Sequence, residues 1–487
     1  MTEPIGDGGP RYPYRFERTA LVGEIRGRYG DLEPGTDSGT VVAVAGRLRT
    51  VRTHGKVAFA DLEDATGRVQ LFAQQAELGE VGMGRFGELK VGDIVGARGS
   101  VVTTRRGELS IRVASLVVLA ECRRPMPEKW HGLTDVEARY RQRYLDLIVN
   151  PESRDVVAAR STANATVRGF LAERGFIEVE TPLLQPMAGG AVARPFITHH
   201  NALDIDLYLR VAPELYLKRL LIGGFERIYE LNRSFRNEGV SPTHSPEYTM
   251  LEAYEAYVDY HDTMSLVEDL VRSIAAAVCG AGPLTIRGER IDLAAAFERV
   301  TMFEAIARHA GRDLEPAWRA GDAAGLRRHA RELSVGIDPA WGPGKVLVEI
   351  FEATAERRLV APTFVAGFPK EVSPLAKDHR SIPGFTEQAD LYLGGVELCP
   401  CYSELNDPDE QRRRFRQQLE ARASGDDEAH LPDEDFLEAL SYGMPPAGGF
   451  GLGIDRLLAV LLGAPSLREV IVFPIMRPAA EPPRSTT

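Results

Sequence analysis

Two carboxylates and two thiols lie close together in the segment GGVELCPCYSELND, residues 394–407. Glu397 and Glu404 are hard oxygen ligands of the kind that Mg²⁺ prefers. Between them lies Cys-Pro-Cys at 399–401, and thiols two residues apart can point the same way from a strand. The residue types leave open a thiol metal site, a redox pair, or a pocket in which the sulfurs are filler. A zinc site is disfavoured because no third cysteine or histidine is near in sequence.

A second group of polar residues is FERIYELNRSFRNEGVSPTHSPEYTMLEAYEAY, residues 225–257. Polarity alternates up to Arg236, and a turn-rich loop leads into a return strand, which predicts an antiparallel hairpin. Burying so many charges is costly unless they meet a polar ligand. Arg236 can bind a phosphate or carboxylate bidentately, and Glu252 with Tyr254 can bind an ammonium. The alternative is a solvated sheet face with surface ion pairs.

A glycine-rich strand at 447–463, AGGFGLGIDRLLAVLLG, leads into an apolar helix with Arg456 in its first turn. Glycine in a strand marks the close approach of a ligand or of another backbone. A cation beside a helix N-terminus suits an anion. The P-loop pattern is absent, and glycines in a strand are by themselves a weak signal.

These segments need a scaffold, and 487 residues are enough for two or more domains. Five short strands with tight turns and one helix at about 75–86 predict a small barrel of the OB-fold type, in a chain of the α+β class. The predicted division is an N-terminal extension 1–36, a barrel domain 37–120, a linker 121–142, and a second domain 143–487 with a helical insertion at about 281–345.

The barrel strands carry two residues suited to single-stranded nucleic acid. Phe59 can stack on a base and Gln70 can bond one, if both face outward from the barrel. The alternative is that Phe59 is simply a barrel core residue.

Composition excludes several classes of protein. The chain is 44% hydrophobic and 26% charged, as ordinary globular proteins are. It lacks a run long and apolar enough to span a membrane, and its first residues do not resemble a signal peptide. Four cysteines without a C-x-x-C pair suit a reducing compartment, so we expect the cytoplasm. The net charge of −12 argues mildly against nonspecific nucleic-acid binding.

Together the three segments resemble the motifs of the class II aminoacyl-tRNA synthetases, and more narrowly the bacterial-type lysyl-tRNA synthetases of class IIb. The resemblance extends from about Tyr12 to Pro478 and is carried by GFIEVETPLL, THSPEYTMLEAY, SELND and GLGIDR. It implies an OB-fold anticodon-binding domain followed by an antiparallel six-stranded sheet flanked by helices. It also implies a homodimer with the segment around Pro182 at the interface.

The resemblance implies ATP-dependent activation of L-lysine to lysyl-adenylate and its transfer to the 3′ end of tRNA(Lys), with Mg²⁺ as cofactor. The implied catalytic residues are Arg236, Glu397 and Arg456. The implied ATP-binding set is Arg236, Glu238, His244, Tyr248, Glu397 and Arg456. The implied Mg²⁺ ligands are Glu397 and Asp390, where the family usually has glutamate.

The same comparison implies the amino-acid and anticodon sites. Gly190 and Glu214 match the site of the lysine α-ammonium. The ε-ammonium site matches Glu252, Tyr254 and Glu404, and Tyr402 also belongs to the lysine pocket. In the barrel, the anticodon positions are Phe59, Gln70 and Glu108.

The Cys-Pro-Cys segment departs from the family, which usually has a small polar residue between two glycines there. Proline at 400 offers no amide donor, and sulfur is larger than a glycine hydrogen, so we expect a narrower pocket floor. The family geometry also implies a bulge or turn near Pro400. The alternatives are a working lysine pocket with apolar filler, a paralogue that takes a lysine analogue or resists an inhibitor, and a thiol site.

A hypothesis from another class is a protein that binds tRNA or nucleotide without aminoacylating. It predicts that catalytic positions are lost. Because Arg236, Glu397 and Arg456 are all present, it is disfavoured.

Overall fold

The computed structural model describes residues 12–127, 133–187, 189–190, 193–423 and 432–478. The chain divides into two compact units, Met1–Gly132 and Leu133–Thr487, called here the barrel unit and the sheet unit. Among the described residues, no helix combines the length and the apolar character needed to span a membrane.

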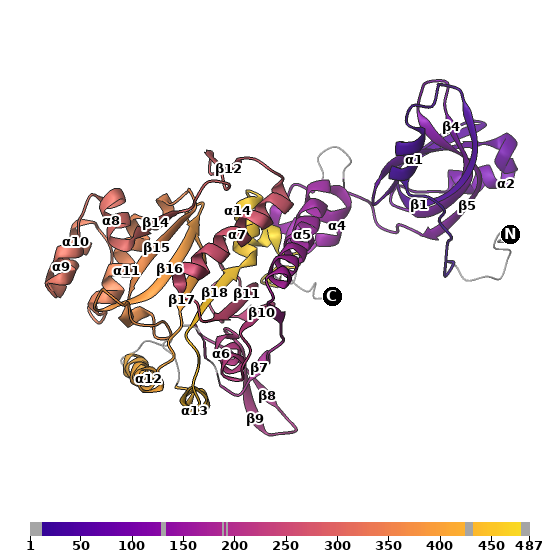
Figure 1. Ribbon diagram of the computed structural model, residues 1–487. Helices are drawn as coiled ribbons and strands as arrows, with labels where there is room; N and C mark the ends of the chain where they lie inside the picture. Colours follow the sequence, from indigo (N-terminus) through magenta and orange to yellow (C-terminus); the bar gives the residue numbers. More distant parts are fainter. Residues whose placement is uncertain (1–11, 128–132, 188, 191–192, 424–431, 479–487) are drawn as a thin grey trace, which may run out of the picture. The chain divides into compact units, whose positions relative to one another are not determined.

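The barrel unit is a closed five-stranded barrel with the strand order β1-β2-β3-β5-β4 (Figure 1). The strands are β1 (Asp37–His54), β2 (Val57–Asp64), β3 (Gly67–Gln74), β4 (Ile94–Thr103) and β5 (Leu109–Ala120), with α2 (Gln75–Gly87) after β3. Every second residue of β2 is buried in the barrel core, as its alternating sequence predicts. The predicted OB-fold barrel is therefore confirmed.

The residues before the barrel also pack on it. Helix α1 (Val22–Tyr29) buries Val22 and Ile25 in the barrel core, and the backbone N–H of Val22 donates to Asp64 at 2.9 Å. This part of the predicted extension thus contributes to the stability of the barrel.

The sheet unit is built on an eight-stranded sheet, with the order β14-β15-β16-β17-β18-β11-β10-β6. The six inner strands are antiparallel, as predicted, and are β15 (Thr363–Pro369), β16 (Phe385–Leu393), β17 (Val396–Ser403), β18 (Ala447–Gly453), β11 (Glu247–Ala256) and β10 (Arg227–Phe235). The edge strands β6 (Ile177–Glu178) and β14 (Glu298–Thr301) pair in parallel and were not predicted as part of this sheet.

Helices cover one face of this sheet and partly cover the other. Helices α5 (Pro151–Glu173), α7 (Tyr260–Cys279) and α14 (Ile454–Leu461) pack on one face and form the main hydrophobic core with it (Figure 1). On the other face, α6 (Glu214–Ile222) and α13 (Glu434–Ser441) pack with Ile228 and Tyr254. The remaining part of that face is free to line a cavity.

The predicted helical insertion is wrong in its first part. The segment begins with β12 (Leu284–Ile286), β13 (Glu289–Ile291) and β14, because Arg287 and Gly288 adopt positive φ and form a hairpin turn. Helices follow only afterwards, as α8 (Met302–Ala310), α9 (Glu315–Arg319), α10 (Ala323–Glu332) and α11 (Pro343–Thr354). Helices α8, α10 and α11 share a core with β15.

The remaining elements connect these layers. A small three-stranded sheet has the order β7-β9-β8, with β7 (Leu184–Gln185), β8 (Phe196–His200) and β9 (Ile205–Leu209). The other helices are α3 (Val136–Arg141), which begins within the predicted linker, α4 (Arg143–Val149), α12 (Pro408–Ala423), α15 (Leu467–Val470) and the short 3₁₀ turns Glu356–Arg358 and Lys370–Val372.

Candidate active site

A cavity on the open face of the large sheet brings together most of the predicted site residues. Its lining includes Gly190, Glu214, Arg236, Glu238, His244, Tyr248, Glu252, Tyr254, Glu397, Tyr402 and Arg456. Asp390 and Glu404 are buried residues that are not part of this lining, and they are described below. Motifs that are far apart in sequence thus meet at one place, as the resemblance implied.

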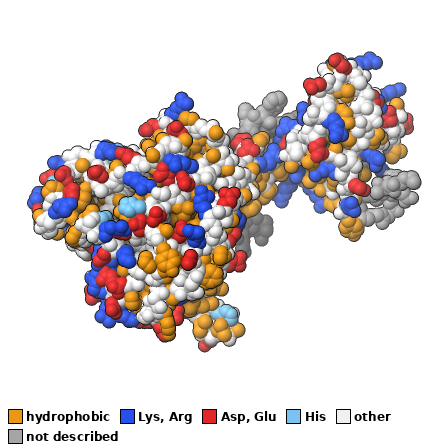
Figure 2. All heavy atoms as spheres, viewed as in Figure 1, with side chains coloured by type: hydrophobic (Ala, Val, Ile, Leu, Met, Phe, Trp, Pro, Cys, Tyr) orange, Lys and Arg blue, Asp and Glu red, His pale blue; other side chains and the backbone are white. Residues whose placement is uncertain are grey.

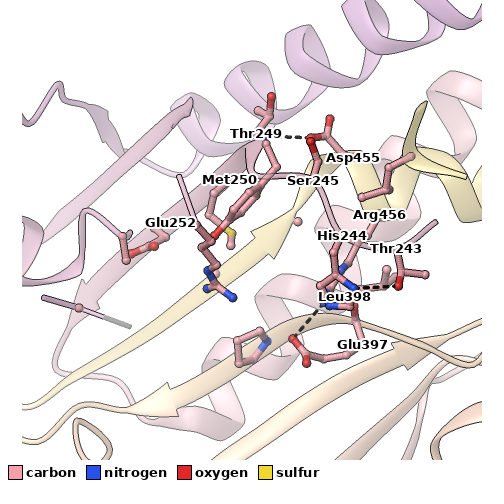
Figure 3. A pocket seen from close by; sticks show the side chains of 18 of the residues that line it. Thr243, His244, Ser245, Thr249, Met250, Glu252, Glu397, Leu398, Asp455 and Arg456 are labelled. Carbon is pink, nitrogen blue, oxygen red and sulfur yellow. Dashed lines mark hydrogen bonds and ion pairs between the residues drawn. The ribbon is translucent and has the colours of Figure 1, made fainter. Parts of the chain in front are cut away.

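Strand β11 supplies one wall of the cavity by simple alternation. Tyr248, Met250, Glu252 and Tyr254 all face the cavity, and Figure 3 shows Met250 and Glu252 projecting into it. The Glu252 carboxylate accepts a hydrogen bond from Tyr254 Oη at 3.0 Å. Burial, and next the charge of Glu214, raise the pKa of Glu252 to about 8. A buried carboxyl of this kind suits a cationic ligand.

Arg236 and Tyr248 each carry a buried polar atom that no described residue bonds. The Arg236 guanidinium lies 5.5 Å from the centre of the Tyr248 ring. Arg236 Nε and Tyr248 Oη are buried without a hydrogen-bond partner among the described residues. Because buried polar groups are nearly always bonded, these two atoms point to a ligand with acceptor oxygens. An arginine in this position favours an anion.

The glycines of β18 allow pocket side chains to lie against the backbone. A Cβ on Gly449 would come within 2.1 Å of Glu404 Oε1 and 2.6 Å of the Tyr254 ring. Only glycine leaves room for both groups, so Gly449 accommodates two side chains of the site. The approach of a ligand or of another backbone, which the glycine-rich strand predicted, stays a prediction.

Arg456 lies in the first turn of α14 and contacts Glu397 directly in the cavity (Figure 3). Arg456 Nη1 donates to the Glu397 backbone carbonyl at 3.0 Å and lies 3.5 Å from Glu397 Oε1. Its Nη2 is 3.4 Å from His244 Nε2, and His244 Nδ1 is 2.8 Å from Ser241 Oγ. Burial, and next the charge of Arg456, lower the pKa of His244, which keeps the imidazole neutral.

The predicted metal ligands lie on neighbouring strands. Asp390 of β16 is almost fully buried, and its Oδ1 accepts a hydrogen bond from Gln388 Nε2 at 2.9 Å. Burial, and next the charge of Glu397, raise the pKa of Asp390 well above its usual value. A divalent cation near both carboxylates would relieve this repulsion, so the two residues fit Mg²⁺ held by one or two carboxylates and substrate phosphates.

Glu352 and Glu356, two further acidic residues near Asp390 and Glu397, were not predicted from the sequence as site residues. Burial, and next the charge of Glu356, raise the pKa of Glu352 to about 7. The charge of Glu397 also raises the pKa values of Glu352 and Glu356. Their four-residue spacing was the available signal. Within the described ranges, no group of three or more histidine, cysteine, aspartate or glutamate side chains is arranged to hold a metal.

The Cys-Pro-Cys segment presents its proline to the cavity and its thiols to the core. A bulge at Leu398, between the pairs Leu391↔Cys399 and Tyr392↔Glu397, brings both Glu397 and Pro400 to the cavity side. The bulge expected near Pro400 is therefore present.

Cys399 and Cys401 are fully buried in the main core. The prediction that sulfur narrows the pocket floor is wrong, because alternation along β17 turns both thiols to the opposite face of the sheet. Burial raises the pKa of Cys399 well above its usual value. A neutral thiol among apolar side chains suits neither metal binding nor redox exchange.

A second cavity lies on the barrel unit and is lined by Phe59, Gln70 and Glu108. Phe59 lies outside the barrel core and stacks on Phe72, with ring centres 5.1 Å apart and planes 7° apart. The core alternative for Phe59 is therefore wrong. Gln70 Oε1 accepts a hydrogen bond from Ser110 Oγ at 3.1 Å. The same cavity is lined by the arginines Arg52, Arg105, Arg106 and Arg112.

Lys218 was also not predicted from the sequence as a site residue. It is a fully buried residue of α6, and its ammonium lies 2.6 Å from both Glu214 Oε1 and Glu404 Oε2. The four-residue spacing of Glu214 and Lys218 was a signal for the first contact, but nothing in the sequence indicated the second.

Comparisons with known proteins agree with this geometry. Residues 135–477 match the family described as tRNA synthetases class II (D, K and N), and residues 42–119 match the OB-fold nucleic acid binding domain.

Three relatives are each named lysine–tRNA ligase. The one from Moorella thermoacetica is 52% identical over 474 residues, which cover 97% of this chain and 94% of the relative. The one from Carboxydothermus hydrogenoformans is 50% identical, with 96% and 94% covered. The one from Xanthomonas oryzae pv. oryzae is 50% identical, with 97% and 94% covered.

Family matches over most of the chain, close relatives along nearly its whole length, and a cavity where the three motif segments meet lead to one conclusion. The chain belongs to the class II tRNA synthetases of the D, K and N family and carries an OB-fold domain of the nucleic-acid-binding kind.

Proposed function

We infer that the chain is a lysine–tRNA ligase, which activates L-lysine with ATP to lysyl-adenylate and transfers the lysyl group to tRNA(Lys). This conclusion rests on one cavity that offers a cationic group in one part and acidic groups in another. At one place the cavity offers the Arg236 guanidinium, whose Nε has no hydrogen-bond partner among the described residues. At another it offers the buried carboxyl group of Glu252 and the partly buried carboxylate of Glu214. A substrate with an anionic end and two ammonium groups complements both.

The first step is an in-line attack of the lysine carboxylate on the α-phosphate of ATP, with release of pyrophosphate. Arg236 contacts the α-phosphate and the attacking carboxylate, and Arg456 binds the γ-phosphate. Tyr248 stacks on the adenine, while Glu238 and His244 contact the nucleotide. Catalysis comes from positioning and from charge stabilisation, without a covalent intermediate on the enzyme.

Mg²⁺ completes the nucleotide site in this proposal. Glu397 and Asp390 would hold it, and when bound it would neutralise charge on the phosphates.

The two amines of lysine occupy separate acidic groups. The carbonyl of Gly190 and the carboxylate of Glu214 receive the α-ammonium. Glu252, Tyr254 and Glu404 receive the ε-ammonium, and Tyr402 packs beside the aliphatic chain. The ribose hydroxyl at the 3′ end of the tRNA then attacks the adenylate.

A direct test is aminoacylation by the purified protein. With ATP, Mg²⁺, labelled L-lysine and total tRNA, we expect acid-precipitable lysyl-tRNA to accumulate. Omission of ATP or of tRNA is the control. Charging of tRNA with a different amino acid and not with lysine would refute the assignment.

We propose that the barrel cavity binds the anticodon, with Phe59 stacking on a base, Gln70 bonding to it and Glu108 beside it. Phe59→Ala should lower kcat/KM for tRNA in aminoacylation by about 10- to 100-fold, because base stacking on an aromatic side chain contributes about 1–3 kcal/mol. ATP–pyrophosphate exchange with lysine should be unchanged, since it does not use tRNA. A loss of both activities would instead indicate that the variant misfolds.

A second candidate function is that of a paralogue with an altered pocket, and the observation that favours it is Pro400 in the cavity lining. Proline supplies no hydrogen-bond donor there, so Arg236 would hold the substrate carboxylate with less help. This alternative predicts exchange with a lysine analogue and none with lysine.

We further propose a homodimer that acts in the cytoplasm. The hydrophobic side chains of Leu184, Ile197 and Ile205 are exposed on the small sheet, and that of Ile177 is exposed on β6, the edge strand of the large sheet. Figure 2 shows hydrophobic side chains on the projecting β8–β9 hairpin. Exposed apolar surface of this kind marks an interface. Ile197→Glu should convert a dimer to a monomer in sedimentation velocity, whereas Val81→Glu on the barrel unit should not.

A further inference from the structure

Lys218 is a buried cation inside the proposed lysine site. Its side chain is 0% exposed, and its ammonium contacts Glu214 Oε1 and Glu404 Oε2, each at 2.6 Å, and the Leu375 carbonyl at 3.5 Å. Three acceptors match the three donors of an ammonium. Burial disfavours the charge of Lys218, but the carboxylates of Glu214 and Glu404 outweigh it and raise the pKa of Lys218 above its usual value.

The charges around the site can be counted from these contacts. Three carboxylates belong to the proposed amine sites: Glu214, Glu252 and Glu404. The adjacent Glu230 is neutralised separately, since its Oε1 pairs with Arg210 at 2.7 Å. When lysine is bound and all three carboxyl groups are ionised, the amine sites together with Lys218 carry two net negative charges, which equals the number of ammonium groups on lysine.

Lys218 also determines where the acceptor oxygens lie. It joins α6, which carries Glu214, to the end of β17, after which Glu404 follows. Because Lys218 binds Glu404 through Oε2, the other oxygen, Oε1, lies against Gly449 beside the Tyr254 ring, which lines the cavity. One cation therefore orients carboxylates of both proposed amine sites.

We propose that Lys218 is a positioning and specificity-determining residue, which orients Glu214 and Glu404 and sets the charge of the pocket for a diamino acid of the length of lysine. The proposal rests on the lysine site proposed above. The cation acts through the two carboxylates and does not itself contact the substrate.

The test is the Lys218→Met variant in ATP–pyrophosphate exchange. KM for lysine should rise by about 10- to 100-fold, the usual effect of losing a residue that orients the groups holding a charged ligand, because Glu214 and Glu404 lose the cation that fixes their oxygens. KM for ATP should be unchanged. The ratio of kcat/KM for lysine to that for ornithine should fall, because a Glu404 carboxylate released from Lys218 can reach a shorter amine.

The matched control is Lys370→Met. Lys370 also bridges two carboxylates, Asp378 at 2.7 Å and Glu410 at 2.6 Å, but it lies outside the cavity lining. Its loss should leave both KM values and the lysine/ornithine ratio unchanged.

A second variant and a second measurement distinguish the proposed role of Lys218 from misfolding of the Lys218→Met variant. Lys218→Gln keeps hydrogen-bonding capacity without charge, and it should retain more thermal stability than the methionine variant while still raising KM for lysine. In thermal unfolding, the shift in Tm caused by lysine should shrink in both variants, and the shift caused by ATP with Mg²⁺ should remain. A purely structural role would diminish both shifts together.

Failure of this inference is distinguishable from failure of the proposed function. If the wild type exchanges with lysine and Lys218→Met keeps the wild-type KM and selectivity, the inference is wrong and the function stands. If the wild type does not exchange with lysine, both are overturned.

Discussion

Arg236→Met should reduce kcat for lysine-dependent ATP–pyrophosphate exchange by about 10²- to 10³-fold, the loss seen when one preorganised donor to a developing charge is removed. The guanidinium lies in the cavity over the Tyr248 ring, and its Nε has no partner in the described part of the chain. Without it, the charge that builds on the α-phosphate would lack its main protein partner. Arg236 is therefore expected to matter more in the transition state than in binding either substrate alone.

Arg233→Met is a matched control for this change. Arg233 lies on β10, shortly before Arg236 in the chain, is partly exposed, and has an ion pair with Glu247 at 3.6 Å. Its loss should leave exchange near the wild-type rate. An Arg236→Met enzyme that retained wild-type exchange would contradict the role assigned to the guanidinium.

Glu252→Gln should lower kcat/KM for lysine by at least about 30-fold, because the substitution removes one of the two carboxylates, Glu252 and Glu404, that receive the ε-ammonium in a buried site. The amide is nearly isosteric, so packing around Tyr254 is retained. Glu255→Gln is the control, since Glu255 lies on the same strand but forms an ion pair with Arg227 at 2.7 Å outside the cavity lining.

The pH dependence of KM for lysine provides a second test of the role of Glu252. Its pKa in the free enzyme is about 8, so below that pH the carboxyl is protonated and must lose its proton to pair with an ammonium. KM for lysine should therefore fall as pH rises from 6 to 8, by up to about tenfold per unit. This dependence should weaken in Glu252→Gln, and a KM independent of pH in the wild type would contradict the assignment.

The same shift has a consequence for stability without lysine. The pKa of Glu252 in the folded protein lies above its ordinary value of 4.5, so the folded state binds more protons than the unfolded state between pH 4.5 and about 8. Its contribution to the stability of the protein is therefore lost as pH rises through that interval. Lysine should offset part of the loss, because its ammonium groups stabilise the ionised carboxylate.

Features that depend on local periodicity could be predicted from the sequence. The two-residue period of β11 predicts that Tyr248, Glu252 and Tyr254 share one face, and all three line the cavity. The glycines of β18 signalled a crowded site, but not that side chains would be the groups lying against Gly449. The barrel followed in the same way from five short strands with turns. The resemblance added the roles, which periodicity alone does not supply.

Features that depend on register or on distant contacts could not be predicted in this way. The extra residue at Leu398 changes the face of the sheet to which the following residues of β17 point. The thiols of Cys399 and Cys401 therefore lie in the core. The contact of Lys218 with Glu404 joins residues far apart in sequence, and its existence depends on how α6 packs against the sheet. Strand β14 was missed because an Arg/Ala-rich composition hid a short edge strand.

The most direct test of the account is ATP–pyrophosphate exchange by the purified protein with each of the twenty amino acids and a set of lysine analogues. The account predicts strong exchange with L-lysine and with no other of the twenty, which would make Cys-Pro-Cys a tolerated variant of a working site. Exchange with an analogue but not with lysine would show that Pro400 has redirected the pocket. No exchange with any amino acid would contradict the central claim and favour a protein that binds tRNA or nucleotide without activating an amino acid.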